Sequence, residues 1–190
     1  MSKRVIVMNF EVASESYQAF SEVKQLVLKR ELKGEQMAVV THQDDGSHQF
    51  KIEDFMDFTG NDNASKGGFI GMLVGVLISP LAILLGWVGG SMIGATRDAK
   101  EISEAQDIFK FLLNKIAPGQ TGLIIIAEED DNRPLNKIVF EQLHGEIARF
   151  DYDEVQAEIQ KAQQVTKETK EKAKDSWEKS HLKDDSNTKE

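Results

Sequence analysis

The feature that most constrains this 190-residue chain is a stretch without charged residues between Lys66 and Arg97. Most of its positions are glycine or large apolar residues, whereas 29% of the whole chain is charged. A continuous helix over this stretch would be roughly 45 Å long, which exceeds the ~30 Å hydrocarbon thickness of a bilayer. Pro80 interrupts it, and proline disfavours helix at its own position and at the one before. The pattern therefore predicts two helical arms joined by a turn at Ser79 and Pro80.

Each predicted arm carries a glycine at every fourth position. The glycines are Gly67, Gly71 and Gly75 before the proline, and Gly86, Gly90 and Gly94 after it. Residues four apart share one face of a helix, so each set forms a flat groove that another backbone can approach closely. Glycine inside a helix costs about 1 kcal/mol relative to alanine in water, and close packing can offset that cost. We therefore predict that the six glycines are the packing and self-association residues of a glycine-zipper hairpin.

Two environments fit this hairpin, which spans about residues 64–96. If the sequences on either side of it complete one sheet, both ends must return to the same side of a membrane, which a single crossing forbids. Each arm reaches only ~20–24 Å, so a re-entrant hairpin is the favoured geometry in a bilayer. Lys66 and Arg97 at its two mouths favour the cytoplasmic side. The alternative environment is the interior of a soluble oligomer, in which the hairpin is buried between subunits.

The sequence before the hairpin predicts a strand, a helix and two further strands. Val5–Phe10 is rich in β-branched residues, and an amphipathic helix follows it. Met37–Thr41 predicts the second strand, Asp44–Gly46 a tight turn, and Gln49–Glu53 an antiparallel return strand. The block therefore reads as β-α-β-β.

The sequence after the hairpin predicts two more helices and two more strands. Phe109, Leu112 and Ile116 recur at helical spacing. Gly122–Ala127 is a continuous apolar run of strand length, which is typical of a central strand covered on both faces. A further helix begins near Asn132–Pro134, and alternating apolar residues then predict a last strand.

The combined element order predicts an α+β fold with a ferredoxin-like βαββαβ sheet, followed by an extra helix and an edge strand. Residues 1–59 and 97–152 would form this split domain, with the hairpin of residues 64–96 inserted into it. Residues 153–190 are expected to form a helix that passes into a charged, disordered tail. From about Gln164 the sequence is too polar to bury the surface that would offset its ordering entropy, so this part is expected to be dispensable for folding.

Composition excludes several classes of function. The net charge of −9 gives a field that repels phosphate backbones, so nucleic acid is not an expected partner. The chain has no cysteine, which excludes disulfides and thiolate metal sites. His42 and His48 flank the predicted turn without further ligands, so solvated side chains are expected there rather than half of a metal site. Glu128–Asp131 is an acidic stretch, and a solvated loop is the expected structure.

No motif for catalysis or cofactor binding stands out. The glycines between Gly67 and Gly75 lack the GK[ST] ending of a phosphate loop and the acidic partner of a dinucleotide site. The sequence therefore predicts no catalytic residues, no metal site and no cofactor, and it leaves open whether a small molecule binds.

Two passages beyond the hairpin resemble a known family. One is Ala117–Gly122, followed by the apolar run to Ala127 and by Glu128 and Glu129; the other is Leu143–Ile147. Together with the glycine-rich hairpin they resemble the DUF1269 family of bacterial predicted membrane proteins, over about residues 4–160. The resemblance implies a small α/β domain split by an apolar hairpin and an association with a membrane. It implies no activity and no site residues, and the charged tail departs from the family's compact pattern.

The sequence thus favours a non-enzymatic, membrane-associated structural or regulatory protein that self-associates through its glycine-zipper hairpin. Membrane lipid and further copies of the chain are its expected partners, with the soluble domain on the cytoplasmic face. The alternative is a soluble oligomeric ligand-binding or sensor module with the hairpin buried in the oligomer.

Overall fold

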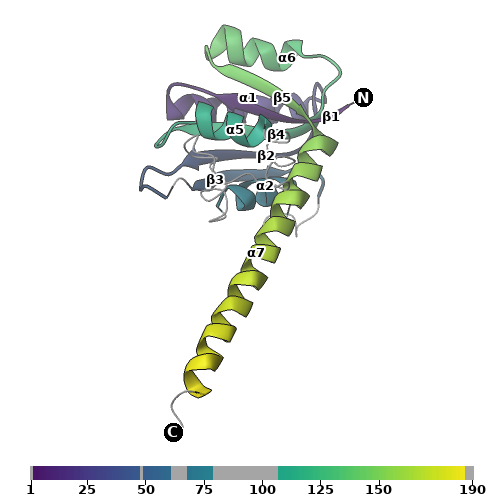
Figure 1. Ribbon diagram of the computed structural model, residues 1–190. Helices are drawn as coiled ribbons and strands as arrows, with labels where there is room; N and C mark the ends of the chain where they lie inside the picture. The colour runs from purple at the N-terminus through teal and green to yellow at the C-terminus, as the bar shows by residue number, and fades with distance from the viewer. Residues whose placement is uncertain (1, 48, 61–67, 79–106, 187–190) are drawn as a thin grey trace.

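The computed structural model describes residues 2–47, 49–60, 68–78 and 107–186. Over these residues the chain has an α+β fold, with one five-stranded antiparallel sheet between two layers of helices (Figure 1). The strands are β1 (Lys3–Asn9), β2 (Lys33–His42), β3 (Phe50–Asp57), β4 (Thr121–Glu128) and β5 (Glu146–Asp151). The helices are α1 (Ala13–Leu28), α2 (Phe69–Leu77), α5 (Asp107–Lys115), α6 (Arg133–Asn136), the π-helix η2 (Lys137–Gln142) and α7 (Tyr152–Ser186).

The sheet combines strands from both sides of the predicted hairpin, in the order β3-β2-β4-β1-β5. The prediction of one shared sheet is therefore confirmed. β4 lies at its centre, and every residue from Thr121 to Ala127 is buried, as the uninterrupted apolar run predicts. Gly122 is required at the start of this strand, because a Cβ there would collide with the side chain of Ile116 and would crowd the carbonyl oxygen of Met8.

The positions of the other strands differ in part from the expected arrangement. β5 forms one edge of the sheet, as expected, and β3 forms the other. β1 and β2 both run antiparallel to β4, so they are parallel to each other with β4 between them. In a ferredoxin-like sheet built from the first four strands, β3 would lie beside β1. In this sheet β4 lies beside β1, because its apolar side chains are buried on both faces. The more polar β3 lies at the edge, where its side chains can contact solvent.

The core has two halves, one on each face of the sheet. Successive residues of a strand point to opposite faces, and β4 accordingly directs Ile124 and Ile126 to one half and Leu123 and Ile125 to the other. Helices α2, α5 and α7 cover the first face, whereas α1, α6 and η2 cover the second. Each half of the core therefore combines elements from before and after the predicted hairpin.

Helix α7 is the expected C-terminal helix, and it extends well beyond Gln164. It is a single helix of 35 residues that continues to Ser186, and residues 187–190, the end of the expected tail, lie outside the described residues. The part of α7 beyond the sheet points away from the domain (Figure 1). Lysine, glutamate, glutamine and alanine are strong helix formers, and Gln164 donates a hydrogen bond to Glu168 one turn later at 3.0 Å. Such local interactions stabilise the helix where it does not pack on the domain.

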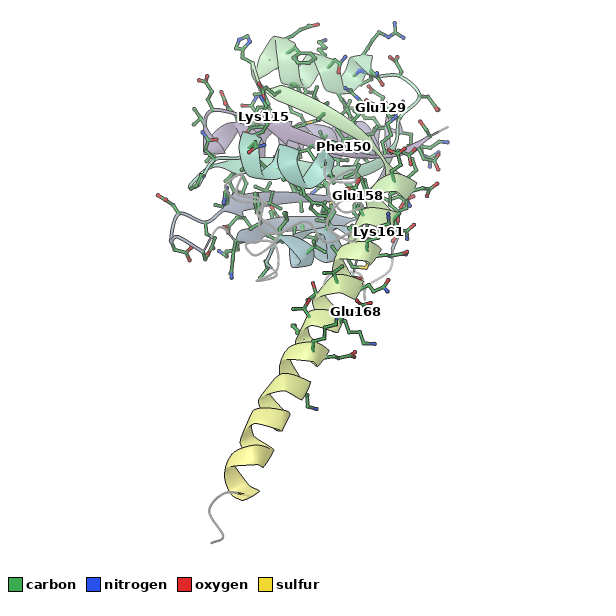
Figure 2. All side chains as sticks on the ribbon, viewed as in Figure 1. Lys115, Glu129, Phe150, Glu158, Lys161 and Glu168 are labelled. Carbon is green, nitrogen blue, oxygen red and sulfur yellow. The ribbon has the colours of Figure 1, made fainter. Side chains whose placement is uncertain are left out.

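The packed part of α7 ends before Lys167. Val155 and Ile159 are fully buried, Val165 and Thr166 are half-buried, and residues 167–172 are exposed. Figure 2 shows Glu158 where the helix crosses the domain and Glu168 beyond it. The folding contribution of α7 should therefore come from its first four turns.

We predict that Ile159→Ala lowers the free energy of unfolding by about 2–5 kcal/mol, because it opens a cavity in the core. The midpoint of thermal unfolding should fall by about 5–15 °C. A chain that ends at Glu168 should instead unfold within ~2 °C of the parent, since it keeps Val155, Ile159 and the half-buried turn at Val165 and Thr166. Circular dichroism melts of both variants make the comparison. A truncated chain that melts as early as Ile159→Ala would contradict this division of α7.

Candidate functional site

The candidate site is helix α2, the first arm of the predicted hairpin, together with the groups that hold it on the sheet. Six of its nine residues are buried against strands and neighbouring helices: Phe69, Ile70, Leu73, Val74, Val76 and Leu77. Their burial explains why a segment with two internal glycines and β-branched valines is helical, since tertiary packing offsets poor intrinsic propensity. The helix ends at Leu77, with Ile78 as its C-cap residue. This arm is therefore packed on the sheet.

A glutamine from β2 caps the start of α2. The first backbone N–H groups of a helix lack partners within the helix. Gln36, which is only 8% exposed, accepts the hydrogen bond donated by the backbone nitrogen of Ile70 at 3.4 Å. Its amide nitrogen donates to the carboxylate of Asp57 on β3 at 2.9 Å. The single side chain thus joins two strands to the first turn of α2.

Asp57 is held in its charged form at this position. Burial opposes ionisation, but hydrogen bonds from Thr59 and Gln36 outweigh it and lower the pKa of Asp57. Because an ionised carboxylate can only accept, the amide nitrogen of Gln36 must face it. The amide oxygen is consequently directed to Ile70.

A second set of contacts joins the start of α2 to the start of α7. The ring of Phe69 stacks on the ring of Tyr152, with their centroids 4.3 Å apart. The ammonium of Lys3 lies 3.9 Å from the centre of the Tyr152 ring and 2.6 Å from a carboxylate oxygen of Glu35. Partial burial disfavours the charge on Lys3, but Glu35 and Tyr152 outweigh it and raise the pKa of Lys3.

A β-bulge in β2 brings these two sets of contacts together. The pairing of β2 with β4 shifts between Gly34 and Gln36, which leaves Glu35 as an additional residue. In a regular strand Glu35 and Gln36 would point to opposite faces. The bulge redirects them, so that Glu35 reaches Lys3 while Gln36 reaches α2. Sequence reasoning missed this feature.

The outer face of α2 carries its glycines. Gly71 is half-buried and Gly75 is exposed, and a Cβ added at Gly75 would meet no atom of the described residues within 4 Å. Beside this face lies an open hollow of about 440 Å³. It is lined by Gln43, Gln49, Phe50, Lys51, Ile52, Gly71, Val74, Gly75 and Ile78. Ile78, which follows the helix, is 41% exposed. Among the described residues, the side of α2 that carries the glycines therefore borders a hollow, whereas its apolar side is packed against the domain.

The remaining residues of the predicted hairpin lie outside the described residues. They are Lys66, Gly67, Ser79, Pro80, Gly86, Gly90, Gly94 and Arg97. Within the described ranges, no helix combines the length and the apolar composition that a bilayer crossing requires.

His42 is not the solvated turn residue that the sequence analysis expected. It is 2% exposed, because β2 continues through it before the turn begins. Its ring stacks on Phe50 with centroids 4.6 Å apart, and its Nδ1 donates to the carbonyl oxygen of Ile116 at 2.6 Å. His48 lies outside the described residues. In the ranges that the structure describes, no group of three or more histidine, aspartate or glutamate side chains is arranged to hold a metal ion.

The acidic stretch after β4 is also not a uniformly solvated loop. The side chain of Glu129 is fully buried, and Arg149 donates to both of its carboxylate oxygens and, at 2.8 Å, to Asn136 at the end of α6. Asp131 remains at the surface, where hydrogen bonds from Arg133 lower the pKa of Asp131 to about 2. The expectation failed for Glu129 because its partner is 20 residues away in the sequence.

We predict that Arg149→Met lowers the free energy of unfolding by about 3–5 kcal/mol, because it leaves the Glu129 carboxylate buried without its partner. The double variant Glu129→Leu/Arg149→Met should recover most of this loss, since it removes both charges. Urea unfolding of the parent, the two single variants and the double variant completes the cycle. Additive losses in the double variant would show that the pair is not coupled.

The fold and the site together define an α+β domain that packs one glycine-bearing apolar helix against its sheet, with Gly71 and Gly75 beside a hollow of the described residues. A family model described as "Protein of unknown function (DUF1269)" matches residues 64–171, which is more than half of the chain. The chain belongs to this DUF1269 family, in agreement with the resemblance noted in the sequence. No curated protein and no solved structure matches the chain.

Proposed function

We propose that this chain is a non-enzymatic self-association module, in which the sheet domain holds the first glycine-bearing helix and presents its glycine face to a second apolar helix. The observation that carries the proposal is the division of α2 into two faces. Its large apolar side chains are buried against the domain, whereas Gly71 and Gly75 face an open hollow. Gly71 and Gly75, the described glycines of the first stripe, are therefore held by a helix that is packed on the domain.

In this proposal, the second apolar helix that packs on α2 is the second hairpin arm of a neighbouring copy of the chain. Gly86, Gly90 and Gly94 repeat the spacing of the first stripe, so the hairpins of neighbouring copies would pack glycine face to glycine face. Close backbone approach gains dispersion and weak Cα–H contacts, which offset the intrinsic cost of glycine in a helix. A structural or regulatory role follows from assembly of this kind rather than from catalysis.

We also propose a ferredoxin-like origin for four of the five strands. β1 and β2 are parallel to each other, and β4 lies between them. β4 and β5 are also parallel to each other, and β1 lies between them. Two interleaved β-α-β units of this kind support a ferredoxin-like core of β5-β1-β4-β2. β3 would then be the added edge strand, and the inserted hairpin would follow it.

Attachment to a membrane is the second candidate function. The charge-free stretch continues from α2 through Thr96, and such composition favours transfer into lipid. With α2 packed on the sheet, only the second arm would be free to enter a bilayer. Lys66 and Arg97 would then lie near the cytoplasmic headgroups, as their charge favours.

We predict that Gly75→Leu weakens the oligomer about tenfold or more, because a side chain would occupy the space that a neighbouring backbone approaches. The domain itself should remain as stable as the parent, since the Cβ has open space and leucine is a better helix former than glycine. Native mass spectrometry over a concentration series measures the first effect, and thermal melts measure the second.

Gln163→Leu provides the matched control, because it also adds a leucine to an exposed helical position but lies on α7. This control should assemble like the parent. Gly71→Leu and Gly90→Leu should behave like Gly75→Leu, each on its own arm. If all three glycine variants assemble as tightly as the parent, the stripes are not contact surfaces.

For membrane attachment, we predict that the full chain floats with phosphatidylcholine vesicles that contain anionic lipid and stays in the membrane pellet after a carbonate wash. A chain with Ile83→Lys and Leu85→Lys in the second arm should remain in the supernatant, because charges are costly in hydrocarbon. A parent chain recovered without vesicles would rule out membrane attachment and leave self-association as the function.

A further inference from the structure

We propose that Tyr152 is a latch residue that couples α7 to α2, so that the position of α7 determines how firmly the glycine-bearing helix is held on the sheet. The latch consists of Glu35, Lys3, Tyr152 and Phe69, in the order in which they contact one another. The inference goes beyond self-association, because it concerns coupling between two helices of a single chain.

The latch acts at the first residue of each helix. Phe69 begins α2 and Tyr152 begins α7, and their stacked rings lie on the same face of the sheet. Aromatic pairs of this kind stabilise by about 0.5–1.5 kcal/mol beyond the area that they bury. A change in the orientation of α7 at its start would therefore be felt directly at the start of α2.

Lys3 and Glu35 fix the ring of Tyr152 from the sheet. The ammonium of Lys3 lies 3.9 Å from the ring centre, within the range of a cation–π interaction, and Glu35 holds that ammonium at 2.6 Å. Both residues are only about one-third exposed, so solvent screens this contact less than a pair on the open surface. Tyr152 therefore has a defined position between the sheet and α2.

Helix α7 has the form that a lever requires. Val155 and Ile159 seat its first turns in the same half of the core as α2, whereas residues 167–172 are exposed. Figures 1 and 2 show this exposed part, which includes Glu168, beyond the sheet domain. Because a helix transmits displacement along its length, a contact on the exposed part would act on Tyr152 through the buried turns.

A separate contact holds α2 when the latch is weakened. Gln36 binds the backbone nitrogen of Ile70 from β2 and does not involve α7. At the other end of α2, Ile78 is 41% exposed. Loss of the latch should therefore loosen α2 without releasing it from the sheet, which makes the effect measurable in a folded protein.

Hydrogen exchange of the full chain tests the proposal. Tyr152→Ala should accelerate exchange of the backbone amides of Met72–Leu77 by roughly three- to tenfold, with exchange in β1 and β4 unchanged. Tyr152→Phe keeps the ring and should exchange like the parent. Tyr17→Ala removes a 43% exposed aromatic from α1 on the opposite face, and it should leave α2 unaffected.

Coupling must also act in reverse, because linkage between two equilibria is reciprocal. Gln36→Leu loosens α2 from the sheet side, and it should accelerate exchange in the second turn of α7, at Gln156–Ile159. If α2 loosens while this turn of α7 keeps its protection, the two helices are not coupled and the proposal is wrong.

Two further outcomes would overturn the latch. One is unchanged exchange of α2 in Tyr152→Ala; the other is equal acceleration throughout the sheet, which would make Tyr152 an ordinary core residue. If Tyr152→Ala does not fold, Lys3→Met takes its place, with an expected acceleration of roughly twofold confined to α2. The native mass of every variant is recorded alongside, so a failure of self-association is distinguished from a failure of the latch.

Discussion

The packing of an uncharged helix against one face of the sheet is the constraint on which the rest of this structure depends. Six apolar side chains of α2 take up that face together with α5 and α7. Their burial fixes which side of α2 faces outward, and that side carries Gly71 and Gly75. The polar contacts at the start of the helix then determine where it lies along the strands. Hydrophobic packing thus orients the glycine stripe, and a few polar groups set its position along the strands.

Much of the fold could be predicted because its signals are local. The apolar run of β4 and the helical spacing of Phe109, Leu112 and Ile116 report burial directly, and all of these residues are buried. The order of strands could not be predicted in the same way, since β3 and β4 compete for the place beside β2 and β1. The π-helix η2 also escaped prediction, because it depends on local backbone energetics that hydrophobic periodicity does not register.

The candidate site was predictable only in part, for a related reason. Glycine spacing identified Gly71 and Gly75 as members of one helix face, and the structure places both of them on the outer side of α2. The groups that seat the helix come from distant positions: Gln36 lies 34 residues from Ile70, and Tyr152 meets Phe69 across an even longer separation. Contacts of this kind leave no periodic trace in the sequence. The burial of His42 and Glu129 was missed for the same reason, because their partners Ile116 and Arg149 are distant in the sequence.

The extended C-terminal helix affects how the size of this molecule is measured. From Glu168 to Ser186 the helix adds roughly 27 Å of length at 1.5 Å per residue. A 21.3 kDa chain with such an extension experiences more friction in solution than a sphere of equal mass. It will elute early from a sizing column, as a larger particle would. It will also sediment slowly, as a smaller particle would. Its stoichiometry must therefore come from light scattering or from mass, which do not depend on shape.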